Sequence, residues 1–241
     1  MIEIFDFEQG SDEWRAARVG IPTASEFSTV LAKGKSGGDS KTRATYMRKL
    51  AGEILTGEPM ESYTNAHLER GKVMEPEARE LYGFVHDCEP RLVGFIRNGN
   101  TGCSPDSLIG EEGMAEFKSA MPHILIDLIE RNEFPPEHYA QCQGGLWIAE
   151  REWIDLVVYW PKLPLFVRRV GRDESYIRNL ESAVGVFNDE LASLVKKIRS
   201  YQSDSISSRA AVAPRPSPPT AVERPTPATR FPAGVAPGEG A

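Results

Sequence analysis

The segment SPDSLIGEEGMAEFK, residues 104–118, constrains the fold of this chain more than any other stretch. It contains two short strand-like runs separated by GEEG, a composition typical of a tight turn. An antiparallel hairpin of this kind places Asp106 opposite Glu116. Because side chains alternate along a strand, Glu116 and Lys118 share one face, and Phe117 points into apolar packing on the other. The sequence therefore predicts two carboxylates and one amine at a single point of a sheet.

Two acids and an amine in this arrangement are the groups that metal-dependent phosphodiester hydrolysis requires. Carboxylate oxygens bind Mg²⁺, which polarises the phosphoryl group and lowers the pKa of a water molecule, while a lysine orients or deprotonates that water. The backbone carbonyl of Phe117 is a further candidate ligand. The alternative is a surface hairpin in which Glu116 and Lys118 form a solvated ion pair, and the short motif alone does not decide between the two.

A third acid comes from the helical pattern RGKVMEPEARELY, residues 70–82. Glu75 lies on the same stripe of this helix as Ala78 and Tyr82, so its carboxylate faces partly apolar surroundings. An unpaired carboxylate is costly to bury. Glu75 is therefore expected to bind either a metal ion or a basic partner such as Arg79, one helical turn later.

The segment EHYAQCQGGLW, residues 137–147, supplies a candidate amide. Its small residues, alanine and two glycines, are expected to let a helix approach the sheet closely and to carry Gln141 towards it. Gln141 would then bind a metal-bound water or a phosphate, or make a structural hydrogen bond. Gln143 falls on another face. His86 and His138 lack a spaced partner and are interpreted as core or surface histidines.

Helical and strand-like patterns alternate along the chain, which indicates an α/β fold with a central mixed sheet flanked by helices. Helices are expected at residues 11–17, 23–33, 41–55, 65–84, 123–132, 136–150 and 174–200. Strands are expected within 91–98, 103–110, 114–120, 153–160 and 165–170. The first three helices should form an N-terminal layer, and Pro76 is expected to kink or restart the fourth.

The composition changes abruptly near Ser203 to a sequence rich in Pro, Ala and Ser, which cannot build a core. Four arginines there nearly balance three acidic residues, so the acidity of the chain belongs to the preceding part. We expect a folded domain over residues 1–202 and a disordered tail over 203–241. A role for the tail as a tether or docking segment, or no role at all, stays open.

The charge and the apolar content limit the classes of function. A net charge of -7 argues against a protein that coats nucleic acid along its whole surface, but it is compatible with one positive channel. No apolar run approaches the roughly 18 residues that span a bilayer, and the N-terminus lacks the form of a signal peptide. A cytoplasmic location without membrane association is expected. Cys88, Cys103 and Cys142 are too scattered for a metal knuckle and are expected to be reduced thiols.

Four sequence blocks in order resemble the lambda-exonuclease or YqaJ-type alkaline exonucleases of phage recombination systems, a branch of the PD-(D/E)xK nucleases. The blocks are WRAARVGIPTASE, RGKVMEPEAR, CSPDSL with EFK, and YAQCQ, and the similarity covers residues 14–201. The resemblance implies a restriction-endonuclease-like core. It also implies a 5′-to-3′ exonuclease that degrades one strand of linear double-stranded DNA to mononucleotides and leaves a 3′ overhang for single-strand annealing.

The resemblance assigns the metal ligands. Asp106, Glu116 and the carbonyl of Phe117 would bind Mg²⁺, and Glu75 would serve a second metal ion or its water. Mn²⁺ is expected to substitute for Mg²⁺.

It also assigns the groups that handle the nucleophile and the DNA end. Lys118 and Gln141 would manage the nucleophile. The family's 5′-phosphate pocket, made of one arginine and two serines, maps to Arg18, Ser25 and Ser104. An arginine fork with two hydroxyls satisfies a terminal phosphate dianion, so a preference for 5′-phosphorylated ends follows.

Further expectations concern DNA strand separation and assembly. The family parts the strands with a basic residue and an apolar wedge, which map to Lys35 and Leu68, although Lys35 replaces an arginine. The resemblance implies a homotrimer ring around double-stranded DNA ends and a single-strand annealing protein as partner, in a bacterial host cell. The proline-rich tail is not part of the family pattern.

The sequence is compatible with two other functions. A structure-specific or restriction-type endonuclease on the same core would cut closed circles and need no 5′-phosphate pocket. A non-catalytic DNA-end scaffold would keep its function when Asp106 is replaced by alanine. A zinc or iron–sulfur role for the three cysteines is the least supported, because clusters generally need four ligands.

Overall fold

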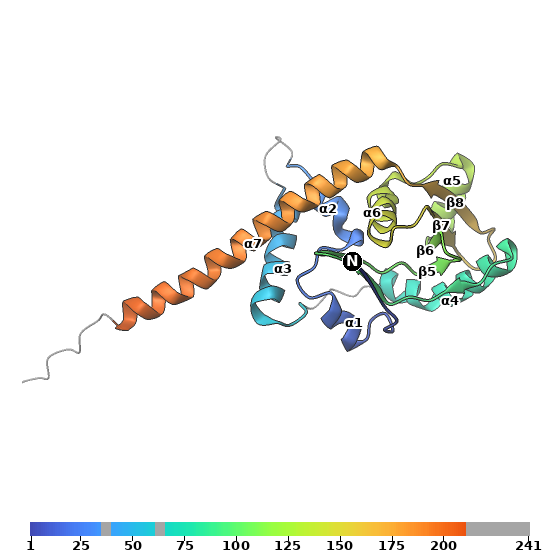
Figure 1. Cartoon of the computed structure of the whole chain (residues 1–241). Helices are drawn as coiled ribbons and strands as arrows, with labels where there is room; N and C mark the ends of the chain where they lie inside the picture. Colours follow the sequence, from blue (N-terminus) through green and yellow to red (C-terminus); the bar gives the residue numbers. More distant parts are fainter. Residues whose placement is uncertain (35–39, 61–65, 211–241) are drawn as a thin grey trace, which may run out of the picture. The chain divides into compact units, whose positions relative to one another are not determined.

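The computed structural model describes residues 1–34, 40–60 and 66–210, of which 66–69, 72 and 202–210 are described by their backbone alone (Figure 1). The chain divides into two units, residues 1–201 and 202–241. The strands are β1 (Ile2–Phe5), β2 (Pro90–Arg91), β3 (Phe95–Asn98), β4 (Thr101–Cys103), β5 (Ser107–Ile109), β6 (Gly113–Ser119), β7 (Trp153–Tyr159) and β8 (Phe166–Gly171). The helices are α1 (Asp12–Ala17), η1 (Ala24–Glu26), α2 (Phe27–Leu31), α3 (Lys41–Thr56), α4 (Ala66–His86), α5 (Pro122–Arg131), η2 (Pro136–His138), α6 (Tyr139–Ala149) and α7 (Glu174–Ala210).

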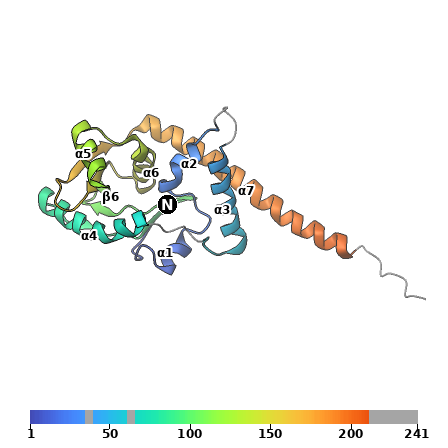
Figure 2. The ribbon, with the colours of Figure 1, turned by 180° about the vertical axis from the view of Figure 1, so that it is seen from behind.

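The central sheet has five strands in the order β2-β5-β6-β7-β8. Strands β6 and β7 are parallel and the other pairs are antiparallel, so the predicted mixed sheet is confirmed. Helix α4 packs on one face through Tyr82 and Phe117, and α5 packs on the other through Leu125 and Leu156. Figure 2 shows α4 and α6 on opposite sides of β6. This central sheet carries the acids of the hairpin between two helical layers.

A second sheet of three antiparallel strands, β1-β3-β4, was not predicted. The run at 91–98, expected as one strand, divides into β2 and β3, which belong to different sheets. The chain turns between them at Gly94, where an added Cβ would lie 2.1 Å from the carbonyl oxygen of Phe7. Glycine is thus required at this crossing, because only a residue without a side chain allows the close approach.

The N-terminal helices differ in part from the prediction. Helix α1 begins after Ser11, whose side chain accepts a hydrogen bond from the backbone N–H of Trp14, and α3 ends at Gly57 with φ +74°. The helix expected at 23–33 is instead a 3₁₀ turn, η1, followed by the short α2. Thr23 makes no capping hydrogen bond there. Its hydroxyl contacts Ser25 instead, so Thr23 does not cap η1.

Helix α4 continues through Pro76, so the expected restart is wrong, and the expected kink stays a prediction. A proline inside a helix costs about 3 kcal/mol because it removes one hydrogen bond and clashes with the preceding turn. In α4 the residues just beyond the proline, Ala78 and Tyr82, are fully buried against the sheet. Their packing with Phe117 outweighs the local preference of the proline.

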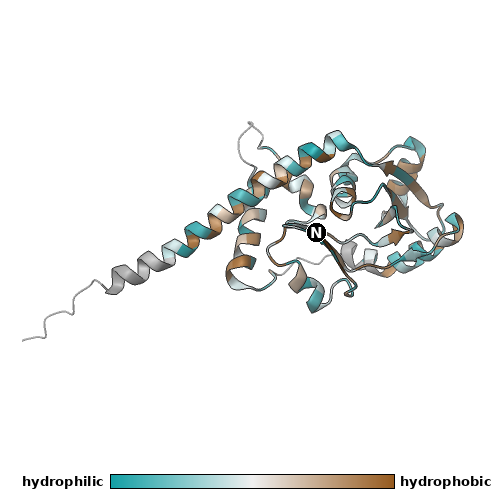
Figure 3. Cartoon of the chain, viewed as in Figure 1, coloured by the Kyte–Doolittle hydropathy of each residue, from teal (hydrophilic) through white to brown (hydrophobic). Residues whose placement is uncertain are grey.

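Helix α7 is longer than the predicted 174–200 and extends past the expected tail boundary at Ser203. Its buried residues recur at helical spacing: Ile177, Leu180, Val184, Phe187, Leu191 and Val195. Figure 3 shows the mixture of hydrophobic and hydrophilic residues along this helix. The first proline after it is Pro214, so residues 203–210 contain no residue that breaks a helix. Helix α7 therefore covers the first eight positions of the expected tail.

None of the helices in the described ranges is long and apolar enough to cross a membrane.

Candidate active site

The hairpin predicted from residues 104–118 is present. Strands β5 and β6 pair antiparallel with Ser107 opposite Ala115, which places Asp106 opposite Glu116. A side-chain oxygen of Asp106 accepts a hydrogen bond of 2.7 Å from the backbone N–H of Phe117. The N–H and C=O of one strand residue point to the same side of the strand, so the Phe117 carbonyl is also directed towards Asp106.

Glu116 is buried and bound by two donors. The Nζ of Lys118 lies 2.7 Å from Oε1 of Glu116, and Nε2 of Gln141 donates to the same oxygen at 2.6 Å. The side chain of Glu116 is 7% exposed and that of Lys118 is 31% exposed. The alternative of a solvated surface pair is therefore wrong.

Burial and like charge dominate the electrostatics of this cluster. Burial, with the neighbouring carboxylates of Glu116 and Glu75, holds the pKa of Asp106 well above its ordinary value, and Lys118 offsets this only in part. Burial alone would lower the pKa of Lys118, but Glu116 and Asp106 outweigh it and raise that pKa. Lys118 therefore carries a positive charge, while the carboxylates around it repel one another.

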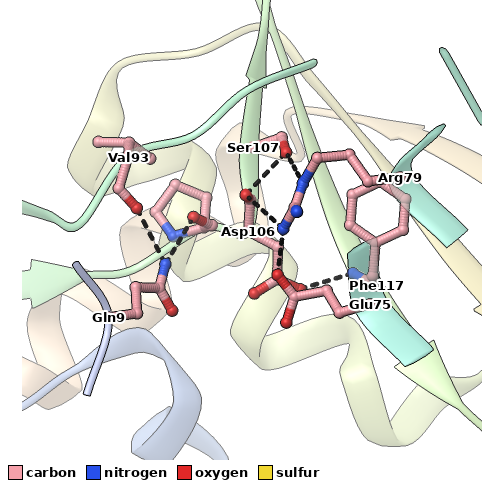
Figure 4. Close-up of polar contacts among 8 residues, drawn as sticks. Gln9, Glu75, Arg79, Val93, Asp106, Ser107 and Phe117 are labelled. Carbon is pink, nitrogen blue, oxygen red and sulfur yellow. Dashed lines mark hydrogen bonds and ion pairs between the residues drawn. The ribbon is translucent and has the colours of Figure 1, made fainter. Parts of the chain in front are cut away.

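Glu75 reaches this cluster from α4 and is paired with Arg79 (Figure 4). The Nε of Arg79 also donates to Oγ of Ser107 at 2.9 Å, and Nη2 lies 3.5 Å from the backbone oxygen of Asp106. Of the two partners expected for Glu75, the basic one is therefore present. A role for Glu75 as a metal ligand stays a prediction.

The three residues mapped to the phosphate pocket come together, although Arg18 and Ser104 are 86 positions apart. Nη1 of Arg18 donates to Oγ of Ser104 at 2.9 Å. Thr23 links Arg18 to Ser25, with Oγ1 at 3.5 Å from Nη2 of Arg18 and 3.2 Å from Oγ of Ser25. Burial lowers the pKa of Arg18.

Sequence reasoning missed Trp14, which completes this cluster. Its indole Nε1 donates to Oγ of Ser104 at 3.0 Å and to the carbonyl of Gly94 at 3.0 Å. The guanidinium of Arg18 lies over the Trp14 ring, 4.1 Å from the centroid. The available signal was its place as the first residue of the WRAARVG block, one helical turn before Arg18.

One cavity of about 210 Å³ joins this cluster to the carboxylates. It is lined by residues of the pocket, namely Trp14, Arg18, Ser25 and Ser104, and by residues of the hairpin and α6, namely Asp106, Glu116, Lys118 and Gln141. Gln9 supports the connecting loop, since its Nε2 donates to the carbonyls of Val93 at 2.9 Å and Pro105 at 3.1 Å (Figure 4). The loop 104–106 thus belongs to both ends of one cavity.

Two glycines of α6 explain how Gln141 reaches the sheet. A Cβ added at Gly145 would lie 3.3 Å from Cε of Met114 on β6, so this glycine faces the sheet as expected. A Cβ at Gly144 would lie 2.4 Å from Cδ2 of Phe27, so Gly144 faces α2 rather than the sheet. Both contacts allow α6 to lie close enough for the bond to Glu116.

The donor set fits a hard divalent cation. In the described part of the chain, no three His, Cys, Asp or Glu side chains are already arranged around a single point that could hold a metal ion. Asp106 and Glu116 nevertheless line the same cavity, and burial together with the neighbouring carboxylates raises the pKa of Asp106. Oxygen donors with excess negative charge are what Mg²⁺ selects.

Other residues singled out in the sequence lie elsewhere or are not described. Lys35 and the side chain of Leu68 lie outside the described residues. Gln143 has a structural role, because Nε2 donates to Gly171 O at 2.9 Å and Oε1 accepts from Asp173 N at 2.8 Å. All three cysteines are unbridged, and Cys103 and Cys142 are buried.

The two histidines differ. The ring of His86 packs on Tyr82, with centroids 4.6 Å apart. His138 is half-buried beside the cluster, where burial and the charge of Lys118 lower its pKa. Because residues three apart on a helix lie on one face, its place three residues before Gln141 could have predicted that it lies near the cluster.

Comparison with known families decides what kind of protein carries this site. Residues 13–152 match the family model of the YqaJ-like viral recombinase domain. The chain belongs to this family. The YqaJ-type assignment made from the four sequence blocks is therefore confirmed, and it places the chain among the nucleases of recombination.

Solved structures agree. The alkaline exonuclease LHK-Exo from Laribacter hongkongensis, in its complex with dAMP, is 31% identical with a TM-score of 0.73, covering 80% of this chain and 99% of its own. A phage-related exonuclease from Haemophilus somnus is 14% identical with a TM-score of 0.57. The match covers 74% of this chain and 96% of that exonuclease, and it shows the fold alone. No curated protein matches the chain.

Proposed function

We propose that this YqaJ-type protein is a metal-dependent 5′-to-3′ exonuclease. It degrades one strand of linear double-stranded DNA to mononucleotides and leaves a 3′ single-stranded overhang for annealing recombination. The observation that carries the proposal is the single cavity that joins the Arg18–Ser104 cluster to the Asp106–Glu116–Lys118 cluster. A terminal phosphate held at one end fixes which phosphodiester lies at the other.

The pocket has the chemistry to hold a 5′-phosphate. A hydroxyl group has two acceptor positions and one donor. Oγ of Ser104 already accepts from Trp14 and Arg18, so its own proton is left for a third group, such as a phosphate oxygen. The guanidinium of Arg18 adds the positive charge. The complex of LHK-Exo with dAMP, a nucleoside monophosphate, supports a mononucleotide product for this chain too.

The hydrolytic groups stand at the other end of the cavity. Asp106, Glu116 and the Phe117 carbonyl would hold Mg²⁺, with Glu75 beside them, and Mn²⁺ would substitute. The ion when bound polarises the phosphoryl group and lowers the pKa of a water molecule. Lys118 and Gln141 would orient that water, because both already converge on Glu116.

Assembly and partners are part of the same proposal. A homotrimer ring enclosing the DNA would make digestion processive, because the enzyme could not easily leave its track. A single-strand annealing protein would receive the 3′ overhang, in the cytoplasm of a bacterial host cell. Both follow from the family resemblance rather than from a contact within the described ranges.

The proposal is tested with three substrates in Mg²⁺: linear DNA with 5′-phosphate ends, the same DNA with 5′-hydroxyl ends, and a closed circle. We expect digestion of the phosphorylated linear DNA, slower digestion of the hydroxyl form and none of the circle, with Lys118→Ala inactive on all. Cutting of the circle would instead favour the endonuclease, and no cleavage of any substrate would favour the scaffold.

A further inference from the structure

Arg79 contacts three of the residues that are proposed to hold the metal ion. Its guanidinium pairs with the Glu75 carboxylate, approaches the backbone oxygen of Asp106 at 3.5 Å and lies over the Phe117 ring, 5.5 Å from the centroid. Its Nε bonds Ser107, which is fully buried at the start of β5. These contacts join helix α4 to both strands of the hairpin (Figure 4).

The position of Glu75 depends on this arginine. Its side chain is 32% exposed, so water offers a competing environment. Its charge also meets the like charge of Asp106, whose pKa it helps to raise. Both effects favour a rotamer turned outward. The ion pair with Arg79, itself only 14% exposed, is the contact that keeps Glu75 beside the hairpin.

We propose that Arg79 is a positioning residue for the metal site. It holds the Glu75 carboxylate of α4 next to the backbone at Asp106, so that the acid from α4 stays beside the acids of the hairpin. This inference rests on the proposed metal-dependent function. It concerns how the ligands are held, because Arg79 as a cation supplies no ligand itself.

The shape of the arginine side chain carries the argument. A planar guanidinium offers five N–H donors in a fixed geometry, whereas a lysine ammonium is a point charge on a flexible stem. Arg79 uses separate nitrogens for Ser107 and Glu75. Arg79→Lys therefore keeps the charge and loses the simultaneous contacts, and Arg79→Met loses both.

The matched control is Arg169, another arginine that binds an acid on the same sheet. Its Nε and Nη2 bond the two oxygens of Asp155, each at 2.9 Å, and it lies 3.5 Å from the centroid of the Trp153 ring. Asp155 is buried and does not line the cavity that contains Asp106 and Glu116. Arg169→Lys thus damages a comparable ion pair that does not line the cavity of the proposed ligands.

The experiment measures Mn²⁺ binding to the full chain without DNA, by calorimetry and by electron paramagnetic resonance of free Mn²⁺, with thermal melts to show that each variant is folded. Groups that hold metal ligands typically contribute about 10- to 100-fold to affinity. We expect a loss of that size in Arg79→Lys and in Arg79→Met, and less than about twofold change in Arg169→Lys, which makes no contact with a ligand. Ser107→Ala, which removes one anchor of Arg79, should show a smaller loss in the same direction.

The outcomes distinguish a failure of the proposed metal-dependent function from a failure of the proposed positioning role of Arg79. Absence of Mn²⁺ binding by the unaltered protein would overturn the metal-dependent function. Binding by the unaltered protein with unchanged affinity in Arg79→Lys would overturn the positioning role alone. Tighter binding in Arg79→Met would also overturn it, because Arg79 would then act only as a repelling charge. If the Arg79 variants do not fold, an unchanged affinity in Ser107→Ala decides against the proposal.

Discussion

The amide nitrogen of Gln141 lies 2.6 Å from Oε1 of Glu116, so helix α6 and strand β6 meet at one carboxylate oxygen. Lys118 donates to the same oxygen. Gln141→Ala should therefore lower kcat by about 10- to 100-fold, as the loss of a group that orients a ligand does, with a smaller effect on KM. Steady-state rates on 5′-phosphorylated linear DNA measure this. Gln141→Glu should be less active than Gln141→Ala, because it sets a second carboxylate against Glu116; a more active Gln141→Glu would contradict the assigned contact.

The raised pKa of Asp106 predicts a pH-dependent gain of stability on its replacement. Its pKa in the folded protein lies above the ordinary 3.8, mainly through burial and Glu116. Stability is therefore lost as pH rises from the unfolded towards the folded pKa, and the loss persists at higher pH. In EDTA at pH 8, Asp106→Asn should melt higher than the unaltered protein, by about 2–4 °C for each 1 kcal/mol relieved. Thermal melts at pH 8 and pH 4 measure the difference, which should shrink at pH 4; an Asp106→Asn protein that melts lower at pH 8 would contradict the electrostatic reading.

Trp14 should control the preference for phosphorylated ends. Trp14→Phe keeps the ring beneath Arg18 but removes the N–H that bonds Ser104, so the Ser104 hydroxyl is no longer held as a donor to phosphate. One hydrogen bond of about 1.4 kcal/mol corresponds to a tenfold change. The ratio of rates on 5′-phosphate and 5′-hydroxyl ends should fall by about that factor. An unchanged ratio, with Ser104→Ala showing a clear fall, would exclude Trp14 from phosphate recognition.

Gly144 should be intolerant of any side chain. An added Cβ would lie 2.4 Å from Phe27, so Gly144→Ala should cost about 1–3 kcal/mol of unfolding free energy and displace Gln141. Gly185→Ala on α7 is the control, because its added Cβ has no atom within 4 Å apart from its chain neighbours and the adjacent backbone of its own helix. That change should be neutral or stabilising by about 0.4–1 kcal/mol. Urea unfolding compares the two, and equal effects would contradict the close packing of α6.

The hairpin could be predicted from sequence because its geometry is local. A turn with Gly110 at φ +55° sets the register, and the register places Asp106 opposite Glu116. Gln141 and Arg79 reach this hairpin from helices distant in sequence. The sequence predicted that Gln141 approaches the sheet and that Arg79 is a candidate partner of Glu75, but it did not predict the bonds to Glu116 and Ser107. The wrong prediction of a helix restart at Pro76 also has a long-range cause. Packing of Ala78 and Tyr82 against the sheet outweighs the local preference of the proline.

The residues of the phosphate pocket could not be predicted from local sequence patterns. Arg18, Ser25 and Ser104 look like ordinary cap and surface residues when taken singly, and only the family resemblance placed them together. Thr23 and Trp14 were missed because their hydrogen bonds depend on how β4 lies against η1, which no periodicity encodes.

The polarity and the product of digestion test the central proposal most directly. A linear duplex with 5′-phosphate ends is labelled with one fluorophore near the 5′ end and another near the 3′ end of the same strand, and products are followed in Mg²⁺. We expect early release of the 5′ label as a mononucleotide, late release or retention of the 3′ label, and no release in EDTA or with Asp106→Asn. Early release of the 3′ label, release of long oligonucleotides, or full activity of Asp106→Asn would contradict the proposed function.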